Sequence, residues 1–128
     1  MNLQLNQDEF TGKVLDEQER PVMVEVWASW CGNCRALDPV IKEVARELAG
    51  EANVYQLKAD DNQQLVKELK IMGVPALLYY RHGVLVRKKL GIQSKKKIVE
   101  TLKELAAYDR QQASERQYKS WWQRLFGK

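Results

Sequence analysis

Residues 22–34 have the sequence Val22-Met23-Val24-Glu25-Val26-Trp27-Ala28-Ser29-Trp30-Cys31-Gly32-Asn33-Cys34. The run from Val22 to Trp27 is almost wholly apolar, which predicts a strand buried on both faces. From Arg35 to Leu48, apolar side chains recur at helical spacing, and Gly50 is a typical helix stop. The two cysteines therefore fall in a tight turn between a strand and a helix.

Cys31 is the expected nucleophile of this turn. A thiol at the first turn of a helix faces unpaired backbone N–H groups and the positive end of the helix dipole, and both favour the thiolate. Such settings lower a cysteine pKa from about 8.5 to roughly 3.5–7.5. Cys34 follows one helical turn later, within reach of a mixed disulfide at Cys31. We expect it to be the resolving thiol, which releases the partner in its reduced form.

Two other interpretations of the cysteine pair stay open. A Cys-x-x-Cys pair can be half of a zinc site, but the chain has only two Cys and one His, His82, so four protein ligands would require distant carboxylates. The pair could also be retained in a domain that serves only in binding, because a motif stays a hypothesis until its structural context is known.

The motif Trp30-Cys31-Gly32-Asn33-Cys34 resembles that of the thioredoxin family. Three further features agree with it: Val26-Trp27-Ala28 before the motif, Pro39 within the following helix, and Gly73-Val74-Pro75 ahead of a later apolar strand. The resemblance implies an α/β thioredoxin fold, with a central mixed β-sheet flanked by helices on both faces. It also implies dithiol–disulfide exchange with protein substrates. We expect the chain to act on them as a reductase, with a separate reductase as its electron donor, whose identity the sequence does not reveal.

The resemblance also implies a surface that binds the substrate. Pro75 would follow a cis peptide bond and lie against the cysteine pair, where Val74 offers its backbone to an extended substrate. Asn33 stands where the family often has proline; without that fixed φ, we expect the balance between dithiol and disulfide to shift. The residues implied in substrate binding are Trp30, Gly32, Asn33, Val74, Pro75 and Gly91.

Glu25 is unusual because it interrupts the apolar strand. An unpaired carboxylate in a central strand costs several kcal/mol, so we expect its pKa to be raised. The resemblance aligns Glu25 with the family's buried acid and implies a proton acceptor for Cys34. Gln56 lies near the position of a lysine that accompanies this acid in relatives, so one stabiliser of the charged form is missing. Alternatively, Glu25 points to an edge of the sheet or pairs with a lysine.

The remaining pattern predicts short strands and helices in alternation. Helix signals are a cap at Asn6 with Glu9 three residues on, the run Leu65–Leu69, and a cap at Ser94 before the apolar face Ile98, Leu102 and Leu105. Strand signals are Leu3 with Leu5, 54–60, 74–80 and 84–86, with a hairpin turn at 81–83.

Composition fits one globular domain with redox chemistry. The chain has 128 residues, of which 45% are hydrophobic, enough for one core. Its N-terminus lacks the basic and apolar regions of a signal peptide, and no stretch approaches the ~20 apolar residues of a membrane span. We therefore expect a cytoplasmic location. Nothing in the sequence suggests a dissociable cofactor or a nucleic-acid partner, and we expect no bound metal.

The last twenty residues differ in character from the rest. We expect a thioredoxin-like domain over 1–108 and a basic, aromatic extension over 109–128, in which 109–117 form a polar linker. A helix through 118–126 would place Tyr118, Trp121, Trp122, Leu125 and Phe126 on one face. That face could pack back on the domain, dock in a partner protein or lie on an anionic membrane. An alternative function is thus a binding module held to a complex or membrane by this extension.

Overall fold

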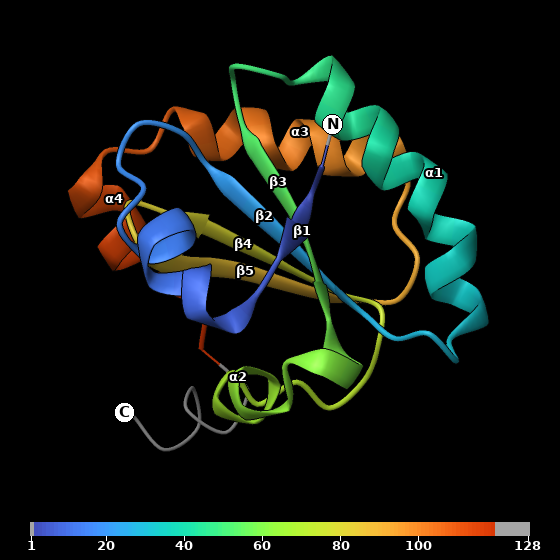
Figure 1. Ribbon diagram of the computed structural model, residues 1–128. Coiled ribbons are helices and arrows are strands. Elements are labelled where there is room, and N and C mark those ends of the chain that lie inside the picture. Colours follow the sequence, from blue (N-terminus) through green and yellow to red (C-terminus); the bar gives the residue numbers. More distant parts are fainter. Residues whose placement is uncertain (1, 120–128) are drawn as a thin grey trace.

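The structure, a computed structural model, describes residues 2–119 (Figure 1). Its strands are β1 (Gln4–Leu5), β2 (Val22–Trp27), β3 (Asn53–Lys58), β4 (Ala76–Arg81) and β5 (Val84–Leu90). Its α-helices are α1 (Gly32–Glu47), α2 (Gln63–Glu68), α3 (Lys95–Ala106) and α4 (Arg110–Glu115). Shorter helical turns occupy Gln7–Glu9, Thr11–Leu15 and Ala59–Asp61.

The strands form one mixed sheet with the order β1-β3-β2-β4-β5. Strands β1, β3 and β2 run parallel, whereas β4 is antiparallel to β2 and β5 is antiparallel to β4. Strand β2 is central and its side chains are buried except for the half-buried Trp27, as its apolar sequence predicts. The carboxyl end of β2 leads directly to the turn that carries the cysteines.

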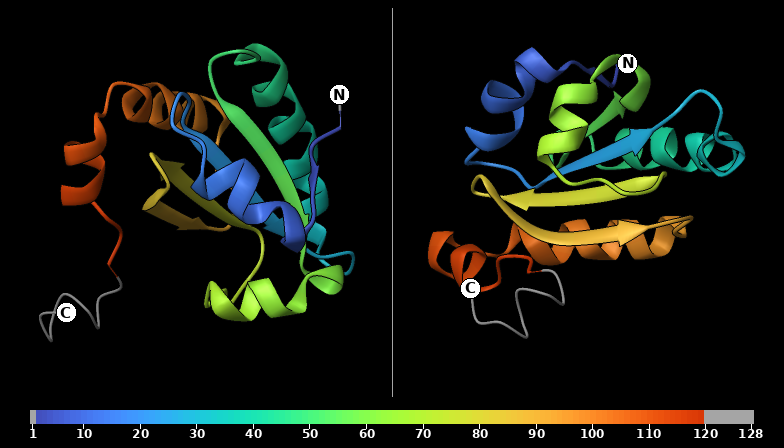
Figure 2. Two further views of the ribbon diagram at one scale, coloured as in Figure 1. Left: turned by 60° about the vertical axis from the view of Figure 1, so that its left-hand side comes forward. Right: turned by 90° about the horizontal axis from the view of Figure 1, so that it is seen from below.

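Helices cover both faces of the sheet, which confirms the expected architecture (Figures 1 and 2). On one face, α1 and α3 pack over Met23, Leu77 and Tyr79. On the other face, the turn 11–15 and α2 pack over Val22, Val24, Val26 and Leu78. Because successive side chains of a strand alternate between faces, Glu25 lies on the same face as Met23 and points toward α1.

Two segments differ from the sequence prediction. The helix expected after Asn6 is a 3₁₀ turn followed by a single π-helical turn, although Phe10 and Val14 are buried as expected. The expected polar linker, 109–117, instead contains α4, whose Ala113 is fully buried in the core. The chain after α4 stays at the domain, because the Tyr118 N–H donates to the Leu85 carbonyl at 2.7 Å. The segment 120–128 lies outside the described residues.

Candidate active site

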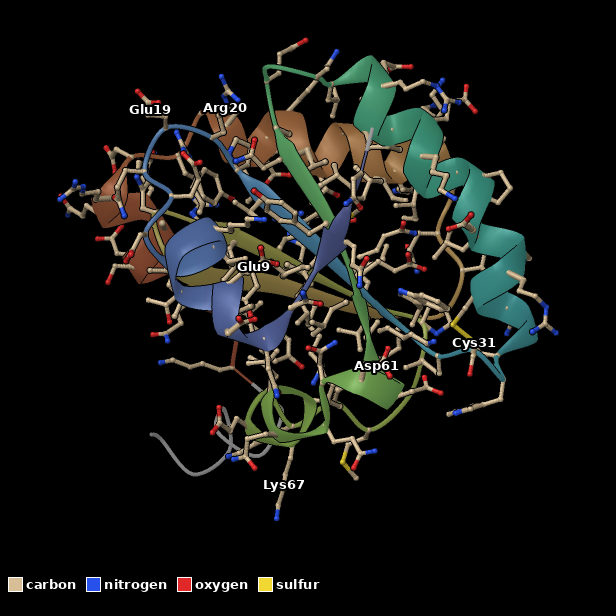
Figure 3. The ribbon with its side chains drawn as sticks, in the orientation of Figure 1. Glu9, Glu19, Arg20, Cys31, Asp61 and Lys67 are labelled. Carbon is tan, nitrogen blue, oxygen red and sulfur yellow. A yellow bond between two sulfur atoms is a disulfide. The ribbon has the colours of Figure 1, made fainter. Side chains whose placement is uncertain are left out.

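Cys31 and Cys34 lie at the N-terminal end of α1 and form a disulfide, with Cα atoms 5.3 Å apart (Figure 3). Cys31 is the N-cap of the helix, and its Sγ accepts the backbone N–H of Cys34 at 3.1 Å. This N–H is one of the first-turn donors that have no partner within a helix. The sulfur of Cys31 therefore occupies a position where backbone dipoles stabilise negative charge once the pair is reduced.

The pair is nearly covered by its neighbours. The exposed fractions are 7% for Cys31 and 3% for Cys34. Ala28, Trp27 and Val74 pack around the two sulfur-bearing residues and form a small cluster separate from the two main cores. Trp30, the residue just before Cys31, is by contrast 74% exposed.

A cavity of about 330 Å³ lies beneath the disulfide. Glu25 from β2 and Cys34 from α1 both line it, and the other lining residues are Trp27, Arg35, Asp38, Lys42 and Gln56. Glu25 is only 1% exposed. The geometry thus brings together Cys34 and the carboxylate that the sequence singled out, in a space large enough for water.

One oxygen of Glu25 is bonded and the other is not. Glu25 Oε1 accepts from Gln56 Nε2 at 2.9 Å, because Glu25 and Gln56 are direct neighbours in the β2–β3 pairing. Glu25 Oε2 is buried and has no hydrogen-bond partner within residues 2–119. A buried acceptor without a partner is costly in a purely structural role and useful in a proton transfer.

Burial raises the pKa of Glu25 to about 7, the direction that the sequence predicts. The hydrogen bond from Gln56 and the charge of Lys42 act the other way, while the nearby Asp38 carboxylate raises the pKa further. A carboxyl group with this pKa exchanges a proton readily near neutral pH.

Asp38 and Lys42 are cavity residues that the sequence did not point to, whereas Gln56 was expected beside Glu25. Gln56 Nε2 also donates to Asp38 Oδ1 at 2.8 Å, and Asp38 pairs with Lys42 at 2.8 Å. A signal was present, because Cys34, Asp38 and Lys42 follow each other at intervals of four and so lie on one face of α1.

The other residues implied in substrate binding lie at the same end of the sheet. The Val74–Pro75 peptide bond is cis, as the resemblance implies, and Val74 packs against the cysteine pair. The Gly91 N–H donates to the Pro75 carbonyl at 2.9 Å, which ties the loop after β5 to the loop before β4. Gly32 and Asn33 are exposed in the first turn of α1.

Two exposed apolar residues next to these loops were missed. Met72 precedes Gly73 and is 91% exposed, and Ile92 follows Gly91 and is 53% exposed. Large apolar side chains in loops beside a glycine were a signal in the sequence, because nothing in the local pattern gives them a core position.

His82, expected to be a loop residue, lies between β4 and β5, where its Nε2 is 3.0 Å from the Tyr108 carbonyl oxygen.

Among residues 2–119, no three His, Cys, Asp or Glu side chains are grouped in a way that could hold a metal ion. Within the same residues, no helix has both the length and the apolar composition needed to cross a membrane.

A covered Cys-x-x-Cys disulfide at a helix N-terminus, beside a buried carboxyl group, defines a thiol–disulfide oxidoreductase. Comparison with known proteins supports this assignment. The sequence model of the Thioredoxin family matches residues 1–104, and the chain belongs to that family.

Several relatives are similar over most of their length. A thioredoxin of Rickettsia felis is 33% identical over 84 residues, which are 66% of this chain and 80% of the relative. A thioredoxin-like protein of Synechocystis is 40% identical over 87 residues, 68% of this chain and 80% of the relative. A thioredoxin of Staphylococcus saprophyticus is 34% identical over 80 residues, 62% of this chain and 77% of the relative. Membership of this family points to protein disulfides as substrates and to a reductase as a partner.

Proposed function

We propose that the chain reduces disulfides of protein substrates in two steps, with Cys31 as nucleophile, Cys34 as resolving thiol and Glu25 as proton acceptor. The observation that carries the proposal is that Cys34 and Glu25 line the same cavity and that Glu25 Oε2 has no hydrogen-bond partner within residues 2–119. Glu25 can therefore take the proton of Cys34 directly or through a single water.

In the first step, the Cys31 thiolate attacks one sulfur of the substrate disulfide. A new S–S bond joins Cys31 to the substrate, the original S–S bond breaks, and the departing sulfur takes a proton. The first-turn N–H groups of α1 favour the attacking thiolate, since Cys31 is the N-cap of this helix.

In the second step, Cys34 loses its proton to Glu25 and attacks the Cys31 sulfur. The Cys31–Cys34 disulfide forms, the mixed disulfide breaks, and the substrate leaves as a thiol. Two electrons have passed from the cysteine pair to the substrate. A reductase then returns the pair to the dithiol.

Substrate binding is assigned to the rim around the disulfide. Trp30 and the exposed first-turn residues Gly32 and Asn33 would contact one side of an extended segment. Val74, Pro75 and Gly91 would contact the other side, and the hydrogen bond between Gly91 and Pro75 holds their two loops together. The exposed side chains of Met72 and Ile92 extend this rim with apolar surface.

Trapping the intermediate tests the assignment of the two cysteines. With Cys34→Ser, a protein disulfide substrate should accumulate as a stable mixed disulfide with Cys31, because the second step is blocked. With Cys31→Ser, no mixed disulfide should form and turnover should stop. A Cys31→Ser variant that still forms the intermediate through Cys34 would contradict the assigned order.

The direction of exchange is tested by equilibrium titration against glutathione, followed by the fluorescence of Trp27 and Trp30. A general reductase should have a potential near the roughly −270 mV of thioredoxins, whereas an isomerase lies near roughly −180 mV. Reduction is also the direction used where thiols are kept reduced, so the proposal includes a cytoplasmic location.

We further propose that the cysteine pair needs no dissociable cofactor, because the dithiol itself carries both electrons. Turnover with a small dithiol as the only donor, after removal of metal ions by a chelator, should match that of the untreated protein.

Nothing in the comparisons supports the alternative of a tethered binding module. The alternative predicts contact of 118–126 with a partner or a membrane. Of these residues, only Tyr118 and Lys119 are among those that the structure describes.

A further inference from the structure

Gln56 bridges two carboxyl groups with one amide nitrogen. Its Nε2 donates to Glu25 Oε1 at 2.9 Å and to Asp38 Oδ1 at 2.8 Å. A side-chain amide has two N–H hydrogens, so both are used in these two bonds. Gln56 is thus a link between the buried carboxyl group on β2 and a half-exposed one on α1.

The link fixes the orientation of the amide. If the Gln56 amide turned by half a rotation, its carbonyl oxygen would face two carboxylate oxygens, and three acceptors would lie together without a hydrogen. With Asp38 in place, only the donor side of Gln56 can face Glu25. Without Asp38, Gln56 could present its carbonyl oxygen to a protonated Glu25 and hold that carboxyl group in its neutral form.

Asp38 is kept in its charged form, in which both carboxylate oxygens are hydrogen-bond acceptors. Partial burial alone would raise its pKa, but the hydrogen bonds from Lys42 and Gln56 outweigh burial, and the pKa of Asp38 is lowered. The Lys42–Asp38 pair is four residues apart on α1, and both side chains reach solvent, with exposed fractions of 53% and 40%. The bridge is therefore intact at neutral pH.

The charged and titratable groups around Glu25 come from α1. They are the thiol of Cys34, the guanidinium of Arg35, the carboxylate of Asp38 and the ammonium of Lys42. Strand β3 contributes Gln56, which is neutral, and the neighbour on β4 is the apolar Leu77. Among residues 2–119, Asp38 is the only acidic side chain besides Glu25 that lines this cavity.

We propose that Asp38 is a positioning residue for the resolving step: it orients Gln56, which holds Glu25 by one oxygen and leaves the other oxygen as the acceptor for the Cys34 proton. The inference rests on the proposed role of Glu25. Helix α1 would then have two roles: it carries the two cysteines, and through Asp38 it also positions the carboxyl group that accepts the Cys34 proton.

The resolving step can be observed separately from the first attack. Reduced protein is mixed with dithiobis-nitrobenzoate, which releases one coloured thiolate when Cys31 attacks and a second when Cys34 resolves the mixed disulfide. Because Glu25 must be ionised to accept the proton, the second phase should accelerate as the pH rises through the titration of Glu25. The rate of this phase and the midpoint of its rise are the two readouts.

Two substitutions separate orientation from charge. Asp38→Asn removes the charge and keeps one oxygen that can accept from Gln56, so the midpoint should move to lower pH and the second phase should slow less than in Asp38→Ala. Asp38→Ala removes the acceptor as well, so Gln56 can turn and the second phase should slow roughly tenfold or more. Alanine favours helix and the site is half-exposed, so both variants should fold.

Glu43→Gln is the matched control. Glu43 is also an acidic residue of α1 in an ion pair, at 2.8 Å from Lys95, but it does not line the cavity. Its substitution should change neither the rate nor the midpoint. An Asp38→Ala protein with the wild-type rate of the second phase would overturn the positioning role.

The variant Glu25→Gln tests the proposed role of Glu25 separately from the role of Asp38. If the pH-dependent rise of the second phase persists in Glu25→Gln, Glu25 is not the acceptor and the proposed mechanism itself fails. If the rise is lost in Glu25→Gln while Asp38→Ala behaves as wild type, only the role of Asp38 is wrong.

Discussion

At the scale of single residues, Glu25 links stability to pH. Its carboxyl group has a pKa of about 7 in the folded protein against 4.5 for the ordinary group, because burial disfavours the charge. The folded state thus keeps the proton to higher pH than the unfolded state. The free energy of unfolding should fall by about 3 kcal/mol as the pH rises through this window, and stay level above it.

The variant Glu25→Gln should remove this dependence. Urea unfolding of the oxidised protein at about pH 5 and about pH 8 should show Glu25→Gln to be more stable than wild type at the higher pH, by up to about 3 kcal/mol, and similar at the lower. The difference between the two proteins cancels the titration of other groups. An equal difference at both pH values would mean that Glu25 does not change its protonation in this range.

Trp30 should matter for substrates and hardly at all for stability. Its side chain is 74% exposed, so Trp30→Ala should change the free energy of unfolding by less than about 0.5 kcal/mol. An aromatic anchor at an interface contributes more than about 1 kcal/mol, so kcat/KM for a protein disulfide should fall roughly tenfold. The loss should be smaller for glutathione disulfide, which covers less of the rim. Equal losses for both substrates would place Trp30 in the chemistry and not in binding.

The sequence predicted Glu25 but not Asp38, and the reason is physical. A carboxyl group within an apolar strand is conspicuous, because such a strand is covered by helices on both faces and a charge there is poorly solvated. Asp38 lies among the polar positions of an amphipathic helix, where an acidic residue is ordinary. Only the packing of α1 over the β2–β3 pair brings it to Gln56, which is 18 residues away in sequence.

At the scale of elements, the turn between β4 and β5 depends on Gly83. Its φ is +76°, and a Cβ added there would collide with the carbonyl oxygen of Leu15. Gly50, at the end of α1, has a similar φ of +84° but open space around it. Gly83→Ala should therefore lower the free energy of unfolding by roughly 2 kcal/mol or more, and Gly50→Ala by only about 1 kcal/mol.

Chemical denaturation of both alanine variants tests this prediction. Gly50→Ala measures only the cost of a positive φ at alanine, so any further loss in Gly83→Ala comes from the contact with Leu15. Equal losses would mean that the segment 11–15 moves aside without cost. The hairpin would then be independent of the turn that packs beneath it.

Element prediction succeeded where one local signal was strong. Strand β2 has the predicted bounds, and α3 is capped by Ser94 and buries Ile98, Leu102 and Leu105 as expected. The segment after Asn6 was predicted as one regular helix, but Thr11 and Gly12 favour helix weakly. The burial of Phe10 and Val14 decides its shape, and that constraint comes from the sheet and not from the local sequence.

At the scale of the whole molecule, α4 belongs to the folded unit. Ala113 is fully buried in the core shared by α1 and α3, and the Tyr118 N–H bonds to β5 through Leu85. His82 and Arg81 also bond to the carbonyl oxygens of Tyr108 and Ala106, which fixes the chain before α4. Sequence patterns could not reveal this, because a single alanine between polar residues carries no signal of burial.

Two truncations test the contribution of this segment. A chain that ends at Lys119 keeps every described contact and serves as the reference. A chain that ends at Tyr108 uncovers part of the core and loses a buried alanine and a backbone hydrogen bond, so its Tm should fall by several degrees. Its disulfide exchange should persist at temperatures well below this Tm, because the cysteines, Glu25 and the cavity lie on β2, β3 and α1. If the two truncated chains melt at the same temperature, α4 rests on the core without stabilising it.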